Sequence, residues 1–206
     1  MTGLPLVLTM GDACGIGPET IVQAFRSGQA AGCFVLGDVG VMRRAAEFTG
    51  GMLPLAVIER AAEALSCPPN CVPVLPAQGL PADLLDAPIG QVDARAGAAA
   101  TACIRQAVAL ALGREVRAIV TAPINKAALA AAGIAFPGHT EMLQAWSGGA
   151  PVRMMLANDE LRTVLVTIHV SLRRAIEQVT HAAVLETLRI ANRSGSKLRS
   201  VSNTLS

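Results

Sequence analysis

Short apolar runs alternate along the chain with longer segments in which helix-forming residues predominate. A short apolar run bounded by glycine, proline or polar residues is typical of a buried strand. A longer segment that opens on proline or a capping residue and closes at glycine is typical of a helix. The pattern predicts strands over 4–10, 33–36, 54–58, 71–75 and 116–121, and helices over 18–25, 39–48 and 94–112. This alternation is expected in α/β proteins.

Shorter elements are predicted in the remainder of the chain. We expect short helices over 125–133 and 141–146, and strands over 152–157 and 161–169. Only Asn158-Asp159-Glu160 separates the last two strands, which predicts an antiparallel hairpin. Ser171 and Thr180 are suited to N-cap two further helices. The expected fold class is therefore α/β, a mixed sheet with helices on both faces.

Composition supports a globular protein and argues against nucleic acid as a partner. The chain has 206 residues, of which 52% are hydrophobic, and this is ample for a packed core. Four Phe, one Trp and no Tyr are too few for the stacking platforms of single-strand binding. Three of the 17 basic residues follow Asn192, so 14 remain against 15 acidic residues and leave no basic footprint.

The sequence predicts a cytoplasmic protein without a membrane partner. The apolar run 4–10 has no basic region before it and continues into Gly11-Asp12, so it is a strand rather than a signal peptide. The Ala-rich segment contains Arg95 and Arg105, which argues against a membrane span. The five cysteines form an odd set without paired metal spacing, and we expect small buried thiols in a reducing cytosol.

The end of the chain has a different composition. From Arg193 onward it is rich in serine and shows no helical stripe, which predicts a disordered tail. We therefore expect residues 193–206 to be a tail that does not belong to the folded part of the chain.

The glycine-rich segment 11–19 follows a predicted strand and opens a predicted helix. In this context backbone amides can cradle a phosphate or a carboxylate. The glycine spacing is not that of a dinucleotide-binding fingerprint, and Pro18 removes one amide donor. The alternative is a tight strand-to-helix turn that needs its glycines. Asp12 would either orient a ligand hydroxyl or cap the turn.

Two polar segments follow the predicted strand 116–121, whose carboxyl end is where α/β sheets bind ligands. Asn125 and Lys126 are candidate ligand contacts, or else a helix cap and a solvated side chain. His139 and Thr140 would present an imidazole and a hydroxyl at a helix start, suited to a phosphorylated substrate, and His139 is also a candidate proton carrier. The alternative for Thr140 is an N-cap beside a surface histidine.

The two other histidines give no complete metal site. His169 ends an apolar β-branched run, so its ring is expected at the edge of a sheet. His181 follows Thr180 at a predicted helix start and is interpreted as structural. A catalytic zinc site needs three protein ligands and an open position, which these residues do not supply by spacing alone.

Five motifs in order give the chain a resemblance to a known family. They are Gly-Asp-x-x-Gly-Ile-Gly-Pro-Glu, Thr-Ala-Pro-Ile-Asn-Lys, Pro-Gly-His-Thr-Glu, Met-Met-Leu-Ala and Thr-Ile-His-Val. Over approximately 4–192 the chain resembles the 4-hydroxythreonine-4-phosphate dehydrogenase family of pyridoxal-phosphate biosynthesis. Each motif alone is weak, and their combination in this order is specific.

The resemblance implies a homodimeric oxidoreductase with an isocitrate/isopropylmalate dehydrogenase-like fold. The reaction implied is NAD- or NADP-dependent oxidation of 4-phosphooxy-L-threonine to a 3-oxo acid, which then decarboxylates to 3-amino-2-oxopropyl phosphate. It further implies that His139 and Thr140 contact the substrate. His169 would be one of three histidines that hold a divalent metal such as zinc, magnesium or cobalt, which would act as a Lewis acid.

The chain departs from the family pattern at two places. Ala13-Cys14 stands where Pro-Ala is usual, and the match ends near Asn192. The family continues with a segment that carries the other two metal histidines and most of the cofactor site. The resemblance therefore implies that residues 1–192 are the N-terminal portion of a two-domain dehydrogenase and that 193–206 lie outside the match. We expect an impaired fragment that neither binds the metal tightly nor turns over substrate by itself.

Three alternative functions follow from the same motifs. A related dehydrogenase of a four-carbon sugar-acid phosphate, such as threonate 4-phosphate, would carry all of them. A non-catalytic remnant would act as a dimerisation or ligand-binding module. A phosphate-binding protein would use only the glycine-rich segment 11–19.

Overall fold

The computed structural model describes residues 3–51 and 53–202, with side chains to Arg193. The chain divides into two compact units, Met1–Gly148 and Gly149–Ser206. The expected boundary at Asn192 stays a prediction. None of the described helices is long and apolar enough to cross a membrane.

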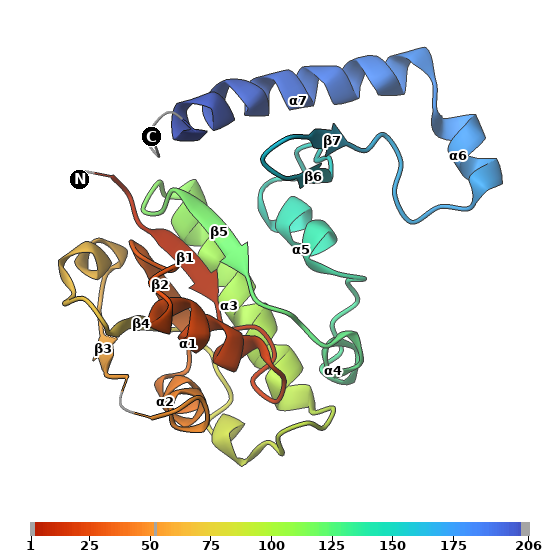
Figure 1. Cartoon of the computed structure of the whole chain (residues 1–206). Coiled ribbons are helices and arrows are strands. Elements are labelled where there is room, and N and C mark those ends of the chain that lie inside the picture. Colours follow the sequence, from red (N-terminus) through yellow and green to blue (C-terminus); the bar gives the residue numbers. More distant parts are fainter. Residues whose placement is uncertain (1–2, 52, 203–206) are drawn as a thin grey trace. The chain divides into compact units, whose positions relative to one another are not determined.

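The first unit is built on a five-stranded parallel sheet (Figure 1). Its strands are β1 (Leu6–Thr9), β2 (Cys33–Gly37), β3 (Leu55–Val57), β4 (Val72–Pro76) and β5 (Ala118–Thr121). Their order in the sheet is β3-β4-β2-β1-β5. All five predicted strands are confirmed, each within a few residues of its expected bounds.

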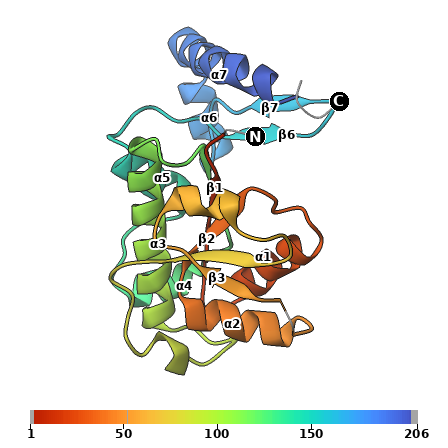
Figure 2. The same cartoon turned by 90° about the vertical axis from the view of Figure 1, so that its left-hand side faces the viewer.

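Helices cover both faces of this sheet (Figures 1 and 2). They are α1 (Gly17–Arg26), α2 (Val39–Phe48), α3 (Ala94–Leu112) and the 3-10 turns η1 (Ala61–Ser66) and η2 (Leu84–Asp86). The α/β class is therefore confirmed as a parallel sheet flanked by helices. Because β1 and β2 are covered on both sides, they read as continuous apolar runs rather than alternating ones.

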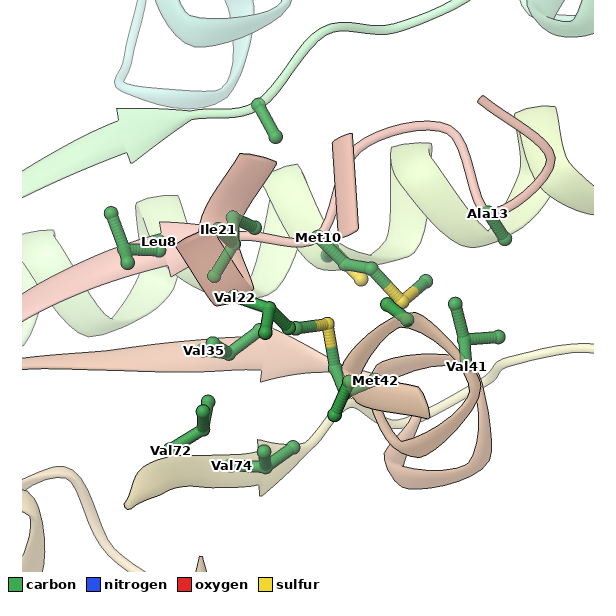
Figure 3. Close-up of a cluster of buried hydrophobic side chains, with 14 of the residues drawn as sticks. Leu8, Met10, Ala13, Ile21, Val22, Val35, Val41, Met42, Val72 and Val74 are labelled. Carbon is green, nitrogen blue, oxygen red and sulfur yellow. The ribbon is translucent and has the colours of Figure 1, made fainter. Parts of the chain in front are cut away.

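The side chains of β1 and β2 divide between two cores. Leu8 and Val35 point to the face covered by α1 and α2, where they join Val22 and Met42 (Figure 3). Phe34 packs on the opposite face with residues of η1 and α3. Successive strand residues point to opposite faces, so one short strand contributes to both cores.

Two short helices extend the first unit beyond β5. They are α4 (Lys126–Ala131) and α5 (His139–Trp146). Met142 and Leu129 are buried against Ile104 of α3. Trp146 meets the Phe136 ring edge-on at a centroid distance of 5.4 Å. The Arg105 guanidinium carbon lies 5.1 Å from the Trp146 ring centroid and anchors the end of α5 on α3.

The second unit contains the predicted hairpin. It consists of β6 (Met155–Ala157), β7 (Arg162–Val164), α6 (Leu172–Gln178) and α7 (His181–Ser202). The two strands pair antiparallel, as expected. They form a sheet of their own, so the prediction of a single mixed sheet was wrong in this respect. Arg153 ties the unit together by donating to Glu186 Oε2 at 2.7 Å and to Thr187 Oγ1 at 2.8 Å.

Both predicted N-caps of this unit are confirmed. The Ser171 hydroxyl accepts from the Arg174 amide, and the Thr180 hydroxyl accepts from the Ala183 amide at 3.2 Å. The backbone of α7 is helical to Ser202, which differs from the tail expected from Arg193 onward. The Thr180 cap and the apolar residues of the first turn nucleate α7. Helical backbone then extends from this nucleus.

Asp93 gives α3 a charged N-cap whose contribution to stability depends on pH. Its Oδ1 accepts from the Arg95 amide at 2.8 Å, and the Arg95 guanidinium donates to its Oδ2 at 2.7 Å. These hydrogen bonds to Arg95 lower the pKa of the Asp93 carboxyl from 3.8 to about 2. The stabilisation is therefore present above pH 3.8 and is lost as the pH falls through about 2.

Asp93→Asn keeps a capping oxygen but removes the charge. We expect it to be less stable than the parent chain near neutral pH, with a difference that shrinks as the pH approaches 2. Urea unfolding at a series of pH values measures this difference. Asp159→Asn, in the exposed turn between β6 and β7, is the charge-matched control. A difference that does not change with pH would contradict the ion pair.

Candidate functional site

The order of the strands in the first unit has a topological switch point at β1. From β1 the chain runs to β2 on one side, whereas β5 pairs with β1 on the other side. In open parallel sheets, ligands bind outside the carboxyl ends of strands at such a switch point. The segments that follow β1 and β5 at this edge contain Asp12 and Asn125. The topology therefore brings together two of the predicted sites.

Close backbone approach explains the glycines after β1. Gly11 has a φ of 75°, and a Cβ on it would lie 2.5 Å from the carbonyl oxygen of Pro123. A Cβ on Gly17 would lie 2.7 Å from the Met10 carbonyl oxygen. The Asp12 amide donates to the Pro123 carbonyl at 2.9 Å and fixes the two loops together. The interpretation of this segment as a tight turn that needs its glycines is confirmed.

The Asp12 side chain caps this turn. It is 7% exposed, and its Oδ1 accepts from the Cys14 amide at 2.9 Å. The Gly15 amide donates to the Asp12 carbonyl at 3.1 Å. The amides of Asp12, Cys14 and Gly15 are thus already engaged within the protein. A phosphate at this loop would lack these three donors, which weighs against the simple phosphate-binding alternative.

Asn125 and Lys126 have local roles. The Asn125 Oδ1 accepts from the amides of Ala127 and Ala128 at 2.9 and 3.2 Å and caps α4. Lys126 is exposed. The structure therefore supports the cap and the solvated side chain that the sequence offered as alternatives. Asn125 retains its side-chain amide nitrogen for another partner.

His139 is the titratable side chain held close to the segment after β5. It begins α5, it is half-buried, and it makes a hydrogen bond with the backbone of Ala122. Its Nε2 is buried without a partner among the described residues. Burial lowers the pKa of this imidazole, and the weaker effect of the Ala122 bond opposes the shift. The alternative of a surface histidine at this position is therefore wrong.

Thr140 lies beside His139 in the first turn of α5. Gly138 is the N-cap of this helix and supplies no side-chain cap. The alternative in which Thr140 caps the helix was therefore wrong. The first turn of α5 therefore has no side-chain cap, and Thr140 within it is half-buried.

His169 belongs to the other unit. It was expected at the end of a strand, but β7 ends at Val164, and His169 lies in the following loop with a φ of 54°. The strand is short because its partner β6 supplies only three paired residues. His169 and His181 are both exposed. Among the described residues no three His, Cys, Asp or Glu side chains gather as a metal site.

Sequence reasoning missed the residues that support the loop after β1. Arg44 of α2 donates to the carbonyls of Ala13 and Leu85, both at 3.1 Å. The Gly90 amide donates to the Cys14 carbonyl at 2.7 Å. These contacts join segments that are distant along the chain, and an arginine on an amphipathic helix carries no signal for them.

Comparison with known proteins gives the family. The family described as "Pyridoxal phosphate biosynthetic protein PdxA" matches residues 29–204. A 4-hydroxythreonine-4-phosphate dehydrogenase of Beijerinckia indica is 44% identical over 189 residues, which cover 91% of this chain and 55% of that protein. A D-threonate 4-phosphate dehydrogenase of Cupriavidus necator is 41% identical, with 90% of this chain and 56% of that protein covered.

A solved structure agrees with this result. The crystal structure of a 4-hydroxythreonine-4-phosphate dehydrogenase from Burkholderia phymatum matches with a TM-score of 0.85 and 36% identity, and covers 96% of this chain and 59% of that one. The chain spans about half the length of the curated relatives it matches. The family match also continues past Asn192, where the motifs alone had suggested that it ends. On these grounds the chain belongs to the PdxA family of pyridoxal phosphate biosynthetic proteins.

Proposed function

We propose that this chain supplies part of the active site of an NAD- or NADP-dependent dehydrogenase that acts on 4-phosphooxy-L-threonine. The secondary alcohol at C3 gives its hydride to the nicotinamide and its proton to a base. The resulting 3-oxo acid loses carbon dioxide and leaves 3-amino-2-oxopropyl phosphate. The relative from Beijerinckia indica, named for this activity, supports the proposal.

The observation that carries the proposal is the buried, unpartnered Nε2 of His139. We assign the bond with the Ala122 carbonyl to Nδ1, which places the proton of the neutral ring there and leaves a lone pair on Nε2. Burial favours this neutral form by lowering the pKa of the ring. Nε2 is thus prepared to accept a hydrogen bond, and then a proton, from a substrate hydroxyl. Thr140 is the proposed neighbouring donor to the substrate.

The residues after β1 and β5 have a supporting part in this proposal. Asp12 and Asn125 fix the two loops by capping, and Lys126 offers an exposed positive charge for a phosphate or a carboxylate. His169 is proposed as one ligand of a divalent metal. The described residues do not complete a three-ligand site around it. We therefore assign no step of the reaction to a metal.

A second candidate substrate is D-threonate 4-phosphate. The Cupriavidus necator relative carries that name at 41% identity. The two compounds share the phosphate, the C3 hydroxyl and the carboxylate, and differ at C2, where one has an ammonium group and the other a hydroxyl. A difference in binding affinity between the two compounds would show which kind of group the site places next to C2. We propose a homodimeric assembly and a cytoplasmic location with either substrate.

The test is to titrate each compound into the purified 206-residue chain, by calorimetry and by NMR of the histidine imidazoles. We expect the substrate to shift the His139 signals and to bind more weakly as the pH falls through the lowered pKa of His139. His139→Gln should weaken binding by about tenfold, the equivalent of one good hydrogen bond. His181→Gln is the control and should bind as the parent does.

Formation of reduced nicotinamide, followed by absorbance with each compound and each cofactor, tests the redox step separately. Binding that does not change in His139→Gln would contradict the role given to Nε2. Binding of neither phosphorylated compound at neutral pH would contradict the proposed function for this chain.

A further inference from the structure

Three cysteines line one cavity at the amino-terminal edge of the parallel sheet. The cavity measures about 510 Å³. Cys33 is the first residue of β2, Cys71 immediately precedes β4, and Cys67 follows η1. The candidate active site lies at the opposite edge of the sheet, beyond the carboxyl ends of β1 and β5. The cysteine-lined cavity is therefore a separate feature, and the proposed function does not use it.

Cys67 and Cys71 are held side by side by a rigid turn. Both thiols line the same cavity, and the neighbouring Cys67 thiol is one cause of the raised pKa of Cys71. The Cys71 thiol donates to the Pro68 carbonyl at 3.0 Å, and the Cys67 thiol donates to the Glu63 carbonyl at 3.5 Å. Two prolines restrict the turn between them, and Asn70 closes it with a φ of 60°. A bond between the two sulfur atoms would span only the three residues that separate Cys67 and Cys71 in the sequence.

Accessibility distinguishes the Cys67 thiol from the other four. Cys67 is half-buried, whereas the four other cysteines are buried. Cys71 is 9% exposed, and burial, together with the neighbouring Cys67, raises its thiol pKa. An exchange reaction begins at an accessible thiol. Cys67 is thus the attacking thiol, and Cys71 is placed to react second. The expectation of five small buried thiols is wrong for Cys67, which is half-buried, and confirmed for the other four.

We propose that Cys67 and Cys71 form a dithiol site that is converted to an intramolecular disulfide by exchange with a low-molecular-weight disulfide. The Cys67 thiolate attacks one sulfur of the external disulfide, forms a mixed disulfide and releases one thiol. Cys71 then attacks the Cys67 sulfur, and the second external thiol leaves. The protein loses two electrons and two protons, and the external disulfide is reduced to two thiols.

The product would join the end of η1 to the start of β4. The bond closes a small ring around the Pro68-Pro69-Asn70 turn, at the mouth of the cavity. Cys33 lines the same cavity, but among the described residues its thiol hydrogen-bonds only to the Ala31 carbonyl, at 3.9 Å. It is therefore the matched control for a thiol that shares the cavity but not the pair.

The experiment is incubation of the full chain with glutathione disulfide, followed by alkylation of free thiols and peptide mass spectrometry. Trypsin releases residues 61–95 as one peptide that contains Cys67 and Cys71 and no other cysteine. We expect this peptide to lose two hydrogen atoms. Cys71→Ser should accumulate glutathione on Cys67, Cys67→Ser should lose the modification, and Cys33→Ser should behave as the parent chain.

Phenylarsine oxide provides a second readout, because its arsenic bonds two neighbouring thiols with release of water. We expect one adduct on the parent chain and none on either single variant of the pair. A glutathione adduct that remains on Cys67 in the parent chain would overturn the proposal. An unmodified 61–95 peptide would overturn it as well, as would an arsenical adduct without any disulfide.

Discussion

Gly97→Ala is expected to destabilise the first unit by about 3 kcal/mol, at the upper end of the usual cost of overpacking. A Cβ on Gly97 of α3 would lie 2.1 Å from the Ala128 carbonyl oxygen and 2.8 Å from the Leu129 amide nitrogen of α4. Replacing glycine inside a helix normally stabilises it by about 1 kcal/mol. Here the contact is with backbone, which cannot rotate away, so the sign is reversed.

Gly40→Ala is the matched control for this prediction. Gly40 also lies inside a helix, α2, and a Cβ on it would meet Leu85 Cδ1 at 2.6 Å. Leu85 is 49% exposed, so its side chain can move aside at small cost. We expect a change within about 1 kcal/mol of the parent chain. Urea unfolding measures both variants, and equal stabilities would contradict the close approach of α3 and α4.

Gly11→Ala is expected to cost about 3 kcal/mol and to disturb His139. The new Cβ would be strained at a φ of 75° and would overlap the Pro123 carbonyl oxygen. Relief requires the loop after β5 to move, and Ala122 in that loop makes the backbone hydrogen bond to the His139 ring. Loss of this bond should lower the pKa of His139 further, because the bond favours the protonated ring.

Gly28→Ala separates the two contributions to this effect. Gly28 has the same φ of 75°, but a Cβ on it would have no heavy atom within 4 Å. Its substitution carries the conformational cost alone, about 1 kcal/mol, and should leave the NMR titration of His139 unchanged. If Gly11→Ala gave the same stability and the same His139 titration as Gly28→Ala, the coupling of the two loops would be disproved.

The sequence alone was sufficient to predict the bounds of helices that contain their own start and stop signals. The helices predicted over 39–48 and 94–112 match α2 and α3 to the residue. Each follows an aspartate whose side chain accepts from a backbone amide of the first turn. These signals are local, so a single sequence contains them.

Elements that depend on a partner were predicted less well. The apolar run 161–169 favoured a long strand, but β7 pairs only where β6 lies opposite it. The start of α5 was also predicted too late. The helix begins at His139 after the N-cap Gly138, which has no side chain to signal a cap, whereas Thr140 suggested a later start. The contact of Gly11 with Pro123 joins segments that are distant along the chain. The shape of the candidate site therefore could not be predicted from the motifs.

The anchoring of α5 has a practical consequence for following this protein in solution. Trp146 is the only tryptophan, and the chain has no tyrosine, so nearly all intrinsic fluorescence comes from one indole. That indole packs on Phe136 and Arg105 at the end of the helix that His139 begins. Emission therefore provides a label-free optical reporter on this one helix, and quenching or a spectral shift on adding a ligand would register movement beside the candidate site.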